Sequence, residues 1–317
     1  MRCIDLHADT IAALMSGASQ GTLRSNSGQA DIEKLTAGGV GAQFFACYFD
    51  KTKVDSPYRT AKDMIAFAKA EMAECADEIQ LVRSTEELEK AEQDGRIGVF
   101  LTIEEGGALE GKMEHLHEFY EEGVRLITLT WNYPNEIGYP NIGYRDAEKG
   151  LTSFGREVVT EMENLGMIVD VSHLSDQGFY DVAELAKKPF IASHSNARAV
   201  TEHPRNLTDE MIRVIAEAGG VIGLNFANIF LGESSVSRVA DMVRHAQHIY
   251  RVGGAEVLAL GSDFDGIDPA VEIRNASMLP MLWESLSRAG FTAADIERMQ
   301  SGNVRRVLRD CLQAGRA

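Results

Sequence analysis

Short apolar segments rich in β-branched residues recur along the chain, and stretches with helical spacing of apolar residues lie between them. The helical spacing is clear in residues 58–76, 113–121, 154–165, 209–218 and 236–250, several of which end near a glycine. Eight segments are predicted as strands: 3–6, 41–48, 97–103, 126–131, 167–171, 190–192, 221–226 and 257–260. Because strands and helices alternate, the pattern predicts a parallel sheet.

Eight strand-and-helix units that close on themselves form a (β/α)₈ TIM barrel, which is the fold we expect for residues 1–317. An open, doubly wound sheet is the alternative, because periodicity alone does not show closure. No stretch has the composition of a linker between domains, so we expect a single domain. Residues 132–148 are predicted as a loop above the fourth strand, and 292–312 as helices beneath or beside the barrel.

Charge and composition narrow the possible partners. The 48 acidic and 31 basic residues of the 317-residue chain give a formal charge of −17, which repels nucleic acids and anionic membranes. The first residues lack the apolar run of a signal peptide, and no segment reaches the length of a membrane span, so a cytoplasmic location is expected. The four cysteines lie far apart and are expected to be reduced and structural.

Side chains that bind metals follow several of the predicted strands. The candidates are His7 and Asp9 after the first strand, Glu104 and Glu105 after the third, His173 after the fifth, His194 after the sixth and Asp263 after the eighth. Barrel enzymes build their active sites at the carboxyl ends of the strands. The positions of these residues therefore predict one shared site at the C-terminal face.

The spacing within these groups favours a catalytic metal site. His7 and Asp9 are two residues apart, so on an extended strand end both side chains point to the same side and can bind one ion. A carboxylate from the third strand, Glu104 or Glu105, could bridge to a second ion held by His173 and His194. Four other histidines lie on predicted helices and are expected to face solvent: His115, His117, His245 and His248.

In combination and order, seven motifs of this chain resemble those of the membrane dipeptidase (renal dipeptidase) family of the amidohydrolase superfamily, over nearly the whole length. They are DLHAD at 5–9, EGG at 105–107, LITLT at 126–130, GMIVDVSH at 166–173, SHS at 193–195, RN at 205–206 and GSDFDG at 261–266. The resemblance implies a barrel with two zinc ions per chain that hydrolyses dipeptides, in some members those with a C-terminal D-residue. It also suggests a homodimer.

By the same resemblance, His7, Asp9 and Glu105 hold one ion, and Glu105, His173 and His194 hold the other. Glu105 is preferred to Glu104 because it directly precedes the pair of glycines. A water shared by two cations loses a proton near neutral pH and can attack the amide carbonyl.

Asp263 resembles the family's catalytic acid on the eighth strand, and would take the proton of the attacking water and return it to the departing amine. The alternative for Asp263 is a role in orienting a ligand histidine. Asp265 is expected to be a structural residue that caps the following turn.

Arg205 occupies the position that binds the substrate's C-terminal carboxylate in the family, a task suited to a planar, two-pronged donor. Two departures from the mammalian pattern concern the substrate. Trp131 stands where those relatives have a histidine that contacts the carbonyl, and Ala227 stands where they have a tyrosine. Asn132 or Tyr133 is a candidate for the missing donor, so the side-chain preference of the site stays open.

Two alternatives remain from the sequence. A related metal-dependent hydrolase would cut another small amide or ester, such as an N-acyl amino acid or a lactone, at the same centre. A non-catalytic barrel would serve as a binding protein, but it would have no physical reason to keep buried carboxylates and histidines together. No phosphate-binding glycine loop and no serine nucleophile motif is present.

Overall fold

A curled parallel sheet forms the centre of the molecule in the computed structural model, which describes residues 2–268 and 270–312. Within these residues one eight-stranded sheet has the order β6-β5-β4-β2-β1-β8-β7, with β3 paired to β4. Its strands are β1 Cys3–Ala8, β2 Val40–Tyr48, β3 Ile79–Leu81, β4 Ile97–Glu104, β5 Val124–Thr128, β6 Ile168–Asp170, β7 Ile222–Leu224 and β8 Leu258–Leu260. Residues 1, 269 and 313–317 of the predicted 1–317 domain lie outside the described part.

The predicted closed barrel is confirmed only as this curled, parallel α/β sheet. Between β6 and β7, residues 190–192 make single bridges, from Ile191 to Asp170 and from Ala192 to Ile222, in place of the predicted sixth strand. The sequence also missed β3, a three-residue strand whose middle residue is the polar Gln80. The other seven predicted strands correspond to strands of the sheet, with ends that differ by a few residues.

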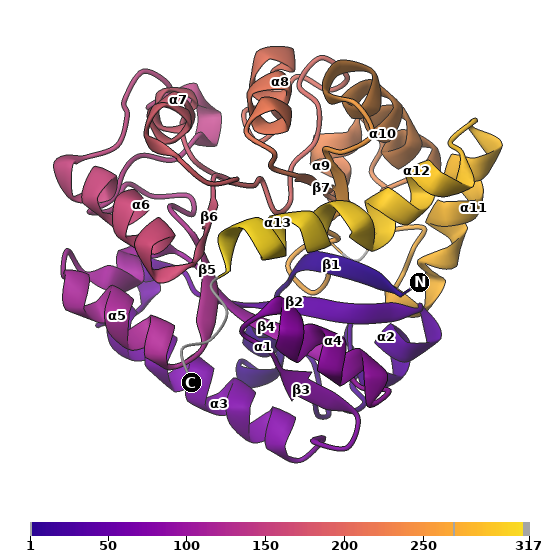
Figure 1. Ribbon diagram of the computed structural model, residues 1–317, viewed down its shortest axis with the longest axis horizontal. Helices are drawn as coiled ribbons and strands as arrows, with labels where there is room; N and C mark the ends of the chain where they lie inside the picture. Colours follow the sequence, from indigo (N-terminus) through magenta and orange to yellow (C-terminus); the bar gives the residue numbers. More distant parts are fainter. Residues whose placement is uncertain (1, 269, 313–317) are drawn as a thin grey trace.

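Helices surround the sheet, as Figure 1 shows. They are α1 Thr10–Met15, α2 Ile32–Ala37, α3 Pro57–Ala73, α4 Thr85–Gln93, α5 Met113–Glu121, α6 Ser153–Leu165, α7 Asp176–Leu185, α8 Asp209–Glu217, α9 Asn228–Leu231, α10 Val239–Gly253, α11 Pro280–Arg288, α12 Ala293–Glu297 and α13 Asn303–Cys311. The five helices predicted from periodicity are α3, α5, α6, α8 and α10. The predicted loop 132–148 contains only the short turn η3 Ile142–Tyr144.

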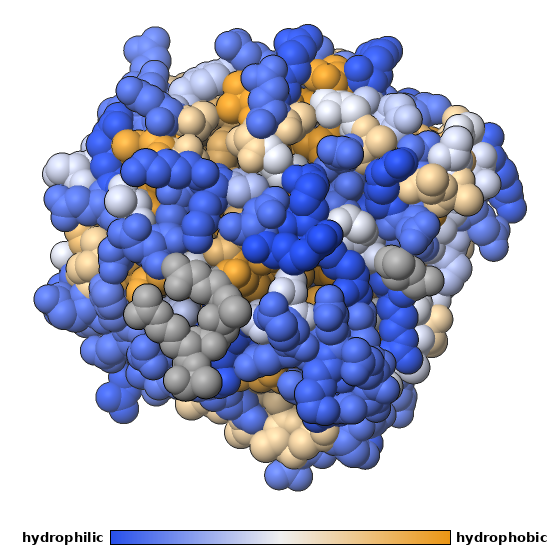
Figure 2. Space-filling view, in the orientation of Figure 1, coloured by the Kyte–Doolittle hydropathy of each residue, from blue (hydrophilic) through white to orange (hydrophobic). Residues whose placement is uncertain are grey.

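Helix α13 covers the amino ends of the strands and thereby leaves their carboxyl ends for the site (Figure 1). The side chain of Asn303 donates to the carbonyl of Leu258 at the start of β8, and Arg306 donates to the carbonyl of Glu256. Apolar residues of α13, among them Val304, pack in one cluster with strand residues such as Phe44. Figure 2 shows mainly hydrophilic side chains on this face of the molecule.

The burial of the helical histidines departs from expectation. His115 and His245 are buried, because each packs the inner side of its helix against the core and hydrogen-bonds a backbone carbonyl there. The side chain of His117 is half exposed, as predicted, whereas that of His248 is mostly covered. All four cysteines are free and buried, which confirms their predicted structural role. Among the described residues, no helix is long and apolar enough to cross a membrane.

Candidate metal centre

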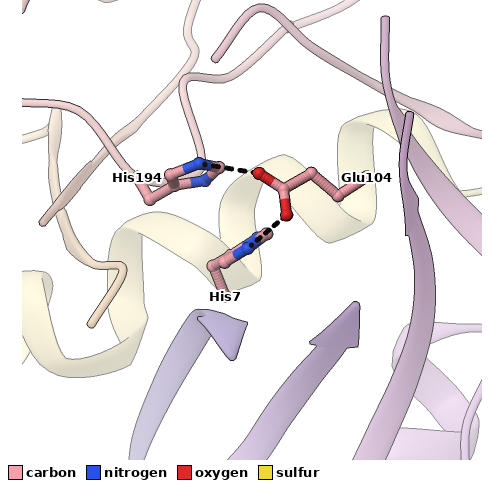
Figure 3. Close-up of side chains that lie close together, drawn as sticks. All are labelled: His7, Glu104 and His194. Carbon is pink, nitrogen blue, oxygen red and sulfur yellow. Dashed lines mark ion pairs between the residues drawn. The ribbon is translucent and has the colours of Figure 1, made fainter. Parts of the chain in front are cut away.

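The carboxyl ends of the strands bring together the side chains of His7, Glu104, His173 and His194. Nε2 of His7 lies 3.3 Å from Oε2 of Glu104. Oε1 of the same carboxylate lies 3.1 Å from Nε2 of His173 and 3.3 Å from Nε2 of His194. The rings of His7 and His194 lie next to each other, with 3.9 Å between their centroids. Figure 3 shows each ring directed at a different oxygen of the Glu104 carboxylate. One buried carboxylate is therefore shared by three histidines.

This arrangement places Glu104 among the three histidines, whereas the sequence favoured Glu105. Alternate side chains of a strand face opposite sides, and Phe100 of β4 packs in the same cluster as α13, inside the curled sheet. Glu104, four residues further, ends β4 on that inner face. Glu105, the next residue, points away from that inner face. Its Oε1 accepts hydrogen bonds from the backbone of Gly107 and the side chain of Asn135, both at 2.7 Å. Glu105 therefore caps the short helix η2 Gly106–Leu109.

Two acidic residues flank the other side of His7. Oδ2 of Asp9 lies 3.5 Å from Nε2 of His7, and Oδ1 of Asp263 lies 3.9 Å from the same atom. Within the described residues, two sets of ligand atoms each lie within 4.8 Å of one another: His7, Glu104 and His194, and His7, Asp9 and Asp263. The two sets share His7, so they form one extended cluster.

A chain of hydrogen bonds fixes the proton of His194 on the side away from Glu104. The hydroxyl of Ser193 donates to Oδ2 of Asp170 at 2.5 Å, and Nδ1 of His194 lies 2.7 Å from that hydroxyl. Because the single Ser193 proton is used by Asp170, Nδ1 of His194 must be the donor in this contact. Nε2 of the neutral ring then presents a lone pair toward Glu104, which is the form that binds metals.

His173 is oriented in the same way by Asn132. Nδ1 of His173 lies 3.0 Å from the side-chain oxygen of Asn132, so this nitrogen is again the donor. The Nε2 atoms of His173 and His194 are 3.1 Å apart, and both face Oε1 of Glu104. Three acceptor atoms that face one another are stabilised by a cation, and histidine nitrogen with carboxylate oxygen is a donor set typical of zinc. The residues present therefore fit a metal ion.

Unpaired atoms and shifted pKa values support the same conclusion. Both ring nitrogens of His7 and Oδ1 of Asp9 are buried without a hydrogen-bond partner among the described residues. Burial raises the pKa of Glu104 to about 8 and that of Asp263 to about 7. Burial also lowers the pKa of His173 well below its ordinary value. A cation in the cluster would favour the ionised carboxylates and the neutral histidines that metals require.

Local backbone geometry aims two of these side chains. His173 and Asp263 both have left-handed backbone conformations, with φ of 68° and 63°. Such conformations are uncommon outside glycine and persist where the surroundings hold them. The side chain of Asn225, just after β7, donates to Oδ2 of Asp263 at 2.8 Å. Asp263 therefore keeps Oδ1 directed toward the cluster.

A pocket of about 350 Å³ opens above the cluster and is lined by the substrate contacts predicted from the sequence, except Tyr133, the alternative to Asn132. Its lining includes Trp131, Asn132, Arg205 and Ala227 together with Asp9, Glu104, His173 and Asp263. Pockets of this size suit small ligands. The prediction that these residues share one site is therefore consistent with the structure, whereas their individual roles remain predictions. Asn132, a candidate substrate donor, uses its oxygen to hold His173.

Arg205 is a buried cation that faces this pocket. Its guanidinium donates to the backbone carbonyl of His194 at 3.1 Å, and Nε has no hydrogen-bond partner among the described residues. Burial lowers its pKa to about 10. Since no described carboxylate forms an ion pair with it, Arg205 is free to receive an anionic group from a ligand.

Sequence reasoning missed two residues of the site. Tyr48 lines the pocket as the last residue of β2. Phe44, four residues earlier, faces the inside of the curled sheet, and the alternation of side chains along a strand could have placed Tyr48 on the same side. Asn225 fell inside the predicted strand 221–226, but it directly follows β7 and contacts Asp263. Asp265 makes structural contacts, because it accepts hydrogen bonds from Thr10 and from the backbone of Gln29, but these residues are not in the following turn that it was predicted to cap.

The pocket wall that carries Arg205 is supported from behind by His245. Nδ1 of His245 accepts a hydrogen bond from the backbone of Ala197 at 3.1 Å, and Nε2 lies 3.1 Å from the carbonyl of Leu231. This buried ring therefore links the loop after His194 to α9, and it must be neutral to make both contacts. Burial lowers its pKa to about 4.

Comparisons with known proteins agree with this geometry. The family model described as membrane dipeptidase (peptidase family M19) matches residues 1–317. Dipeptidase 3 of Rattus norvegicus is 30% identical over 292 residues, which span 90% of this chain and 59% of the rat protein. The structure of the dipeptidase AC, a metallopeptidase of the same family, is 28% identical, with a TM-score of 0.90 over 99% of both chains.

A metallopeptidase from Rhodobacter sphaeroides, solved with a phosphinate mimic of the dipeptide L-Ala-D-Ala, has the same TM-score of 0.90. It is 26% identical, and the match covers 98% of this chain and 99% of that protein.

Proposed function

The chain belongs to the membrane dipeptidase family and is thus a metallo-dipeptidase, and we propose that it uses two zinc ions to hydrolyse small dipeptides. The observation that carries the metal proposal is the set of acceptor atoms around Glu104, which the Asp170–Ser193 and Asn132 contacts hold in the metal-binding form. In this proposal His7, Asp9 and Glu104 hold one ion, and Glu104, His173 and His194 hold the other. Glu104 thus takes the bridging role that the sequence assigned to Glu105.

When bound, the zinc ions would supply an attacking water whose pKa is lowered toward neutrality. The protein's own contribution to the proton transfer lies with Asp263. Its Oδ2 is occupied by Asn225, which leaves Oδ1 to accept the proton of the attacking water. As a buried carboxyl group that has taken up this proton, Asp263 can then return it as a general acid. The proton goes to the departing amine, which is otherwise a very poor leaving group.

Substrate orientation is assigned to Arg205. A dipeptide carries a carboxylate one residue away from its peptide bond, and Arg205 is a buried cation in the same pocket as the cluster. A bidentate contact between guanidinium and carboxylate would hold the scissile carbonyl over Glu104 and its histidines. The volume of the pocket, about 350 Å³, suits a small ligand such as a dipeptide.

The decisive experiment measures metal content and hydrolysis on the same preparation. We expect about two zinc ions per chain, and cleavage of L-Xaa-L-Xaa or L-Xaa-D-Xaa dipeptides that stops on chelation and returns with zinc. Faster cleavage of N-acyl amino acids than of any dipeptide would favour the alternative amide hydrolase. A preparation that binds no metal after exposure to zinc would overturn the proposal.

A further inference from the structure

A second cavity adjoins the pocket above the metal cluster. Its volume is about 420 Å³, and it lies between α1, α3 and the turn that follows Asp263. Asp9, Tyr48 and Gly266 line both cavities. The two spaces therefore meet at this rim, beside a residue to which the proposed function assigns a metal.

The walls of the second cavity are mainly apolar away from the shared rim. They include Ala12, Ala13 and Met15 of α1, Ala18 and Met64 of α3, with Ser16 and Thr60 as the hydroxyl-bearing residues. The carboxylate of Asp265 also lines the cavity, but it already accepts hydrogen bonds from the hydroxyl of Thr10 and the backbone of Gln29. The cavity thus offers apolar contact, and its described lining residues include no basic side chain for an anion.

The position of the cavity relative to Arg205 sets which part of a dipeptide could reach it. Arg205 contacts the backbone of His194, whereas Asp9 contacts His7. Arg205 and Asp9 both line the pocket above the cluster, but only Asp9 also lines the second cavity. A dipeptide whose carboxylate is held by Arg205 and whose peptide bond lies over the cluster therefore directs its N-terminal residue toward Asp9 and the shared rim.

We propose that the cavity between α1 and α3 is a subsite for an apolar side chain on the N-terminal residue of the substrate. The inference rests on the proposed dipeptidase function and names its substrate class: dipeptides that begin with a residue such as methionine or leucine. Met15 is 46% exposed at the edge of the cavity, and a flexible thioether there can adapt to side chains of different shape. A charged N-terminal side chain would lose its hydration against these walls without a partner.

The test compares kcat/KM for Met-Ala and Gly-Ala, with L- and D-alanine in the second position, on the zinc-loaded protein. Ala13→Phe places a ring in the cavity and should lower the Met-Ala to Gly-Ala ratio by at least about tenfold. Met15→Ala removes apolar contact at an exposed position that does not endanger folding, and should lower the ratio roughly fourfold. Met281→Ala is the matched control, because Met281 is 40% exposed on α11 and lines neither cavity.

The outcomes separate the subsite from the dipeptidase function. A fall of the ratio in Met15→Ala and Ala13→Phe, with no change in Met281→Ala, supports the subsite. Dipeptide cleavage with the same ratio in folded Met15→Ala as in the unaltered protein would overturn the subsite and leave the dipeptidase function intact. An unaltered protein that binds zinc and cleaves none of these dipeptides would overturn both.

Discussion

Replacement of Glu104 by glutamine should remove metal from the centre while leaving the fold intact. The carboxylate lies 3.1 Å from Nε2 of His173 and 3.3 Å from Nε2 of both His194 and His7. Glutamine has nearly the same shape, but it carries no charge and replaces one acceptor oxygen by a donor. It therefore removes the negative charge from the point at which the two proposed ions meet.

The size of the effect follows from the position of Glu104 between both proposed ions. Residues that only orient a metal ligand change metal affinity by 10–100-fold, so the loss of a shared ligand should cost at least about 100-fold, or about 2.8 kcal/mol. Because the stabilisation by excess ligand grows with the logarithm of its concentration divided by its Kd, the gain in stability from excess zinc should fall by a similar amount. For a chain of this length that corresponds to a smaller zinc-induced rise of Tm, by on the order of 5 °C.

Elemental analysis after dialysis and thermal unfolding with and without excess zinc measure this effect. Glu105→Gln is the matched control, since its side-chain oxygen can still accept from Gly107 and Asn135 as Oε1 of Glu105 does. We expect this control to keep its metal. Loss of metal from Glu105→Gln but not from Glu104→Gln would refute the assignment of Glu104.

Three further predictions concern residues around the cluster. Asp263→Asn should lower kcat by about 10²–10⁴-fold while zinc content stays unchanged, and loss of metal with activity would instead assign Asp263 as a ligand. Arg205→Lys should raise KM for dipeptides roughly 10–100-fold with a smaller effect on esters that lack a free carboxylate; equal effects on both would contradict carboxylate recognition. The pKa of His245 is lowered to about 4, so its contribution to folding is present above pH 6.5 and is lost as the pH falls through 4. Between pH 6.5 and pH 4 the free energy of unfolding of His245→Gln should therefore fall by about 3 kcal/mol less than that of the unaltered protein, measured by denaturant unfolding. His117→Gln is the control, because His117 is half exposed. The same loss of stability in His245→Gln as in the unaltered protein would contradict the role of His245.

The positions of the strands and the end of the sheet that carries the site could be predicted, because both follow from local patterns. An apolar strand such as β4 and the carboxylates directly after it are visible without any knowledge of long-range contacts. Closure of the sheet could not be predicted in the same way, since residues 190–192 pair with both neighbours through single bridges that no local pattern encodes.

The choice between adjacent glutamates depended on which face of β4 each one occupies. Glu104 and Glu105 are adjacent in the sequence. Only the packing of Phe100 in the cluster that includes α13 shows which of the two alternating sets of β4 side chains faces the inside of the sheet. The burial of His245 likewise depends on contacts with Ala197 and Leu231, which lie 48 and 14 residues away along the chain. Such contacts are set by the tertiary fold.

Helix α13 has a consequence for how the molecule is made. Its residues Val304 and Leu308 complete an apolar cluster that also contains Ile4 and Leu6 of β1, so residues near the two ends of the described chain share one core. Domains fold as units during synthesis, from the amino end onward. Strands β1 and β2, which are synthesised before α13, must therefore wait with an apolar surface uncovered until α13 has been translated. We expect that interval to be the period in which nascent chains of this protein depend most on chaperones.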